Sequence, residues 1–133
     1  MGTARGADGV ASDRSVADRL QLKHDRRLAL VDAPVAVAAA IGAAGRRCGI
    51  EAAEVVLAFA IDRAALDGAI ARTLRDARPD AILWVAYPKL SSRLAGDLHR
   101  DIVRRAASER GLATVAQIAI DDDWSALRLK RAG

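Results

Sequence analysis

The polar residues best suited to binding a ligand follow the ends of three apolar runs, and they are Asp32, Asp62, Tyr87, Lys89, Ser91 and Ser92. Each run has the composition of a strand buried on both faces. In an open parallel sheet, ligands bind beyond the carboxyl ends of the strands, where helix N-termini favour anions. The sequence therefore predicts a small anionic ligand, held by Lys89, Ser91, Ser92 and backbone N–H groups.

The same residues also have a structural interpretation. Aspartate and serine are common helix caps, because their side chains accept the first free N–H groups of a helix. Under this interpretation Asp32, Asp62 and the two serines cap helices, and Lys89 is solvated. The sequence leaves both interpretations open.

No pattern in the chain indicates catalysis or metal binding. The three aspartates at 121–123 lie between two expected strands, where adjacent acidic residues are typical of a turn. Asp97 and His99 are two positions apart on an expected helix, so they do not face each other as a triad with Ser91 would require. We predict no catalytic residue and no metal site, and the balance is against an enzyme.

Trp124 and Arg128 are the candidate contacts for a partner protein, because tryptophan and arginine are enriched among interface hot spots. The other interpretation makes Trp124 a packing anchor at the sheet edge. Trp84, inside the most apolar run, is predicted to lie in the core.

Apolar periodicity and turn residues predict five strands and four helices. We expect strands at 27–31, 54–61, 80–87, 113–120 and 124–130, with 80–87 at the centre of the sheet. We expect helices at 15–22 and 35–44, a third at 63–78 capped by Asp62, and a fourth that begins after Ser91 or Ser92 and ends at Arg110. Strands alternating with helices indicate an α/β fold: a minimal Rossmann-like three-layer sandwich with a mostly parallel five-stranded sheet and a C-terminal antiparallel hairpin.

Two resemblances accompany this pattern. The stretch 78–87 and the helix–strand–hairpin ending are similar to the C-terminal half of Rossmann-type methyltransferases, which implies an enzyme that uses S-adenosylmethionine. That family has a glycine-rich turn after its first strand, whereas the corresponding turn here, 32–35, has no glycine. We therefore predict no cofactor and keep the methyltransferase as an alternative.

The second resemblance is to a small bacterial family of unknown function. It rests on Tyr87-Pro-Lys-Leu-Ser-Ser92 and on the segment that ends in Trp124-Ser-Ala-Leu-Arg128. The family resemblance implies the same fold and leaves the activity open.

Composition limits the remaining possibilities. The chain has 133 residues, 52% of them hydrophobic and 3% aromatic, with a net charge of +4 and one cysteine, Cys48. The positive net charge makes nucleic-acid binding a further alternative. The arginines are scattered along the chain, however, and aromatic residues that could stack on bases are scarce. No apolar run is long enough for a membrane span, and we expect a cytoplasmic protein with a disordered tail at 1–13 and one domain at 14–133. The predicted function is a non-catalytic module that binds a protein partner, a second copy of itself or a small anion.

Overall fold

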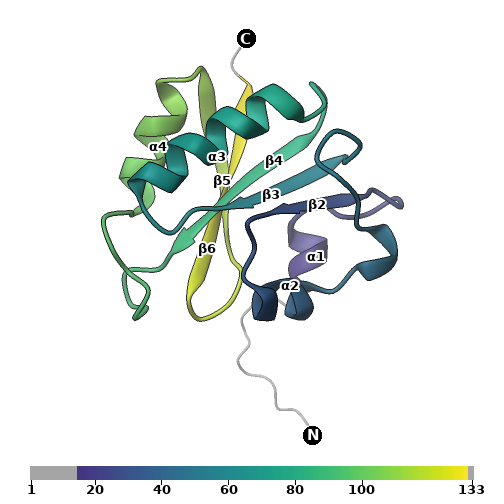
Figure 1. The fold of residues 1–133 in the computed structure, drawn as a ribbon, viewed down its shortest axis with the longest axis horizontal. Helices are drawn as coiled ribbons and strands as arrows, with labels where there is room; N and C mark the ends of the chain where they lie inside the picture. The colour runs from purple at the N-terminus through teal and green to yellow at the C-terminus, as the bar shows by residue number, and fades with distance from the viewer. Residues whose placement is uncertain (1–14, 132–133) are drawn as a thin grey trace, which may run out of the picture.

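A five-stranded sheet forms the middle of the molecule, with helices against both of its faces (Figure 1). The computed structural model describes residues 15–131, so the tail predicted at 1–13 lies outside the described residues. In chain order the elements are α1 (Val16–Arg19), β2 (Leu28–Val31), α2 (Val35–Ile41), the 3-10 helix η2 (Ala44–Arg46), β3 (Val55–Phe59), α3 (Arg63–Asp76), β4 (Ile82–Pro88), α4 (Arg100–Ser108), β5 (Leu112–Ala119) and β6 (Trp124–Arg131).

The strands lie in the order β2-β3-β4-β6-β5. The first three pair in parallel, whereas β6 pairs antiparallel with both β4 and β5. The prediction of a mostly parallel sheet is therefore wrong: the sheet is mixed, and its longer pairings are antiparallel. The cause is the place of β6, which enters between β4 and β5 instead of adding at the edge. The antiparallel hairpin of β5 and β6 and the central place of β4 are confirmed.

Successive residues of the inner strands alternate between two cores, as the pleat of a strand requires. On β3, Val55, Leu57 and Phe59 face the core that α1 and α2 cover, whereas Val56 and Ala58 face the core beneath α3 and α4. Both sets are buried. A strand covered on both sides needs apolar residues at every position, which explains the unbroken apolar runs of the sequence.

Local signals at the helix ends are largely confirmed. Ser15 caps α1 by accepting the N–H of Asp18 at 3.1 Å, and Asp62 caps α3 by accepting the N–H of Ala65 at 2.9 Å. The predicted second helix is shorter than expected, because the chain leaves α2 at Gly42, whose φ of 75° is a left-handed conformation that glycine adopts freely. Within residues 15–131, no helix combines the length and the apolar content needed to cross a lipid bilayer.

The helix predicted to begin at Ser91 or Ser92 is wrong in its first half. The chain between β4 and α4 is a loop, and contacts with distant residues hold it. Ser92 Oγ donates to Asp123 Oδ1 at 2.7 Å, and Asp97 Oδ1 accepts the backbone N–H of Arg63 at 3.0 Å. These bonds hold one end of the loop at the β5–β6 turn and the other end at the N-terminus of α3. They keep the segment out of a helix although its apolar residues have helical spacing.

Candidate functional site

An open groove of about 390 Å³ lies beyond the carboxyl end of β4, at the edge of the sheet where a ligand was predicted. Its floor is a polar row on one face of three neighbouring strands: Tyr87 on β4, Ser125 on β6 and Gln117 on β5. Tyr87 and Ser125 are direct partners in the strand pairing. The walls come from the loop after β4 and from the start of α4, and their residues are Lys89, Leu90, Ser91, His99 and Arg100.

The electrostatic character of the groove is positive. Lys89 and Arg100 line it, and none of the described residues in its lining is acidic. Arg100 reaches across the groove, where its Nη1 donates to Gln117 Oε1 at 3.5 Å. Burial raises the pKa of Tyr87 above its ordinary value, and the positive charge of Arg100 opposes part of this rise. Tyr87 is therefore protonated at neutral pH and keeps a hydroxyl hydrogen that it can donate.

The N-terminus of α4 adds backbone donors to the same place. His99 is the N-cap residue, and within the described chain no side chain accepts a hydrogen bond at this cap. The first intrahelical bond runs from Val103 N to His99 O, so the N–H groups of the preceding turn have no helical acceptor. Free N–H groups and the helix dipole together favour a negative charge here.

The structure brings together three of the predicted ligand-binding residues, Tyr87, Lys89 and Ser91. Ser92 is engaged elsewhere, because its hydroxyl donates to Asp123. Asp62 is occupied as the cap of α3. Asp32 leaves β2 with a φ of 58° and lies two strands away from β4, outside the groove. For Asp62, the helix-cap interpretation accounts for the residue.

Sequence reasoning missed four polar residues of the groove, His99, Arg100, Gln117 and Ser125. Ser125 carried a usable signal. It alternates with Leu127 and Leu129 along β6, so its side chain lies on the face of the strand that is buried in the core, where a polar residue is unusual. The other three carried none, since α4 and β5 meet β4 only through the tertiary fold.

The predicted partner contact Trp124 is accounted for by packing. It is 4% exposed, and its ring meets Phe59 edge-on with centroids 5.1 Å apart. Its strand, β6, is not at the sheet edge as expected, since β5 lies outside it. Arg128 is half-buried on the same face. The aspartates at 121–123 form a turn. In this turn Asp121 Oδ1 accepts the backbone N–H groups of Asp123 and of Trp124, the first residue of β6.

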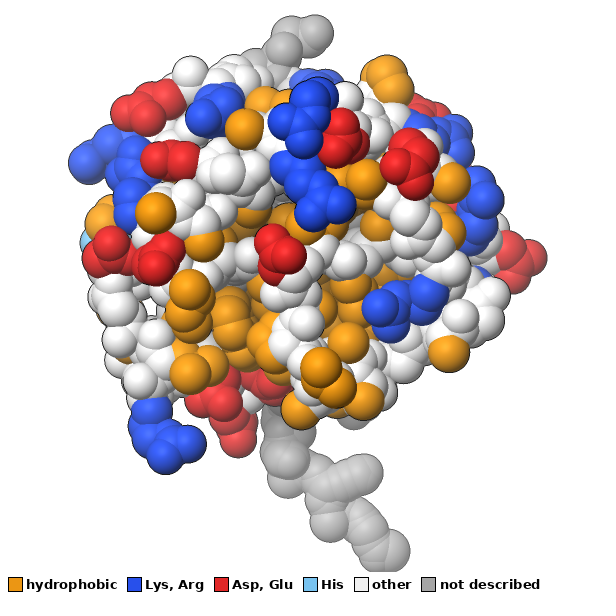
Figure 2. Space-filling view, in the orientation of Figure 1, with side chains coloured by type: hydrophobic (Ala, Val, Ile, Leu, Met, Phe, Trp, Pro, Cys, Tyr) orange, Lys and Arg blue, Asp and Glu red, His pale blue; other side chains and the backbone are white. Residues whose placement is uncertain are grey.

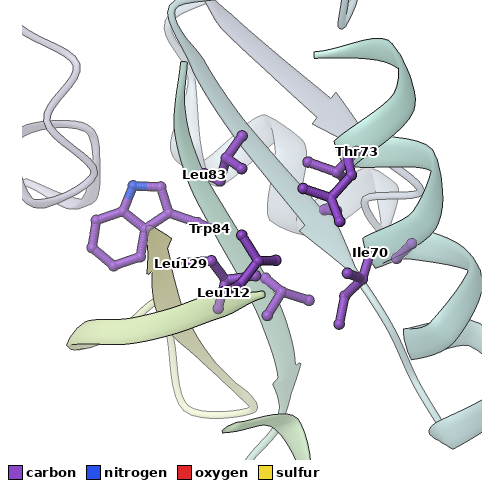
Figure 3. Close-up of a pocket in the computed structure, with 10 residues that line it drawn as sticks. Ile70, Thr73, Leu83, Trp84, Leu112 and Leu129 are labelled. Carbon is purple, nitrogen blue, oxygen red and sulfur yellow. The ribbon is translucent and has the colours of Figure 1, made fainter. Parts of the chain in front are cut away.

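A second cavity lies inside the core, between α3 and the sheet (Figure 3). Its volume is about 10 Å³, and its lining is apolar apart from Thr73. Such a space is near the minimum for one water molecule. It is a packing gap, too small to hold a ligand.

Several cations of α3 and α4 pair with acidic neighbours on the same helix. Figure 2 shows basic and acidic side chains interspersed over the part of the surface formed by α3 and α4. Arg63 pairs with Asp67 at 3.4 Å on α3, and Arg104 pairs with Asp101 at 3.2 Å on α4. In the groove beyond β4, by contrast, no acidic residue of the described chain shares the lining with Lys89 and Arg100.

No protein-family model matches this chain, and no curated protein is similar to it at a significant level.

Proposed function

We propose that this protein is a binding module for a small anion, a phosphate or carboxylate group, in the groove beyond β4. One observation carries the proposal: Lys89 and Arg100 converge with the uncapped N-terminus of α4 over a polar floor, in a lining without acidic residues. Charged donors and free backbone N–H groups are the ligands that oxyanions prefer in proteins.

The polar side chains of the groove suit binding better than catalysis. A serine nucleophile needs a base within hydrogen-bonding reach. Among the described residues, no hydrogen bond joins His99 to Ser91 or to Ser125, although all three line the groove. Their hydroxyl and imidazole groups act instead as additional donors to a bound oxyanion.

A methyltransferase-like enzyme is the second candidate. The chain ends in α4, β5 and β6, and this order supports the resemblance to the helix–strand–hairpin ending of Rossmann-type methyltransferases. The turn after β2, Asp32-Ala33-Pro34, argues against it because a side chain stands at each position where close approach to a cofactor favours glycine. Calorimetric titration with S-adenosylmethionine separates the two: micromolar affinity would favour the enzyme, and no heat from folded protein would favour the anion module.

The test of the anion module is calorimetric titration with inorganic phosphate at low ionic strength, on the wild-type chain and three variants. Lys89→Gln and Arg100→Gln each remove one cation from the groove, and each is expected to weaken binding about tenfold. Arg93→Gln is the matched control, because Arg93 is an exposed cation of the same loop that does not line the groove.

Equal losses in all three variants would mean diffuse attraction to a basic surface and would overturn the proposal. Absence of binding by the wild-type chain would overturn it as well.

A further inference from the structure

The outer side of β5 is an open sheet edge. In the described sheet β5 pairs with β6 alone, and its sequence, LATVAQIA, contains neither a charged residue nor a proline. Natural edge strands commonly carry such residues to prevent pairing with other chains. A bulge between Thr114 and Ala116 interrupts the ladder with β6, so the regular part of the open edge is 116–119.

The backbone groups that face outward follow from the hairpin. Ile120 N–H donates to Trp124 O at 2.9 Å, so the backbone of Ile120 faces β6. In an antiparallel ladder, alternate residues turn their N–H and C=O groups to opposite sides. Gln117 and Ala119 therefore present theirs to the open side, where a further strand can bind them.

The groove beyond β4 continues along this edge. A hollow of about 330 Å³ between α4 and β5 shares Arg100 and Gln117 with it. A third, of about 390 Å³, shares Arg104 and Thr114 with the second and reaches Gly111 at the start of β5. These three adjoining hollows, here called the channel, run beside β5 from Leu112 to Gln117, and α4 forms their wall.

The wall of this channel is basic. Arg100 and Arg104 lie one helical turn apart on α4 and both line the channel, and none of the described lining residues is acidic. Arg104 also pairs with Asp101 at 3.2 Å on the exposed surface of α4, and an acidic side chain of a bound strand would share its guanidinium group. A strand added at β5 directs every second side chain toward α4. Acidic side chains at those positions would meet the two guanidinium groups.

We propose that an extended acidic peptide segment binds in this channel by adding to β5 as a further strand, with its acidic side chains on Arg100 and Arg104. A second copy of this chain fits less well, because two-fold pairing of β5 with itself would bring the same basic wall of each copy together. The proposal goes beyond the anion module, since it rests on the open edge and would hold if the groove beyond β4 bound no phosphate.

The experiment measures the fluorescence anisotropy of a short, blocked, labelled peptide in which valine and glutamate alternate. Ala119→Pro removes one outward N–H and should weaken peptide binding about tenfold, while Ala119→Val keeps the N–H and should bind like the wild-type chain. Arg104→Gln should weaken binding of the glutamate peptide. A peptide of alternating valine and lysine should not bind.

Phosphate titration of the same variants separates this proposal from the proposed function. Ala119 and Arg104 lie outside the lining of the groove beyond β4, so both variants should keep wild-type phosphate affinity.

Three results would overturn strand addition: no binding of the glutamate peptide, equal binding by Ala119→Pro and Ala119→Val, or a dimer in sedimentation that Ala119→Pro dissociates. If Ala119→Pro fails to fold by circular dichroism, Arg104→Gln decides, because its substitution is on the exposed surface. Unchanged peptide affinity in Arg104→Gln would then overturn the proposal.

Discussion

Thr73 has a buried hydroxyl that makes no hydrogen bond with any described residue. The residue lies on α3, is 5% exposed, and faces the small cavity of Figure 3 among apolar neighbours. We predict that Thr73→Val makes the protein more stable, because valine keeps the shape of threonine and replaces the hydroxyl with a methyl group.

The size of the effect follows from the burial. An unsatisfied buried polar group costs about 1–3 kcal/mol, and threonine and valine have similar helix propensities. We therefore expect the free energy of unfolding to rise by about 1 kcal/mol, the lower end of that range. For a chain of this length the midpoint of thermal unfolding should rise by about 3–5 °C.

Urea unfolding followed by tryptophan fluorescence measures the change. Thr73→Ser is the control, because it keeps the hydroxyl and removes the methyl group, and it should lower the free energy of unfolding by about 1 kcal/mol. The slope against urea should be the same for all three proteins. A valine variant less stable than the wild type would refute the reasoning and would show that the hydroxyl has a partner, such as a water molecule in the cavity.

Three further predictions concern stability. The hydrogen bonds and charge of Arg27 lower the pKa of Glu54 from 4.5 to about 2, so the ionised side chain stabilises the fold above pH 4.5 and this contribution is lost as the pH falls toward 2. Urea unfolding at a series of pH values should show the stability difference between Glu54→Gln and the wild type shrinking across that window, and a constant difference would contradict the linkage. Trp84→Phe removes the 3.0 Å hydrogen bond that the indole N–H donates to the Leu20 carbonyl. The free energy of unfolding in urea should fall by about 2–3 kcal/mol, and a fall of less than about 0.5 kcal/mol would contradict a stabilising role for that bond. Asp62→Ala removes the cap of α3 and should cost about 1 kcal/mol in the same assay, whereas Asp62→Asn should keep most of it.

Features that depend on neighbouring residues were readable from the sequence. The apolar runs of β3 and β4 follow from burial on both faces, and Asp62 caps α3 through a bond to a residue three positions away. The carboxyl end of β4 was a reasonable place to expect a ligand, because strand ends and helix N-termini meet there in any sheet of this kind.

Where local pattern and distant contact disagreed, the distant contact decided. Leu94 and Leu98 have helical spacing, yet both lie in the loop before α4, since Ser92 is bound to Asp123 and Asp97 to the start of α3. The spacing of apolar residues indicates which side of a helix could be buried. It carries no information about hydrogen bonds to residues far along the chain.

The sequence by itself determined the strands of this protein, the caps of α1 and α3, and one wall of the groove, Lys89 and Ser91. Only the tertiary structure decided that β6 lies between β4 and β5. That choice places Ser125 beside Tyr87, brings Gln117 and Arg100 to the same groove, and leaves β5 as the open edge. The physical reason is that strand order depends on which of several apolar strands pair most favourably, a competition between distant segments that no local pattern records.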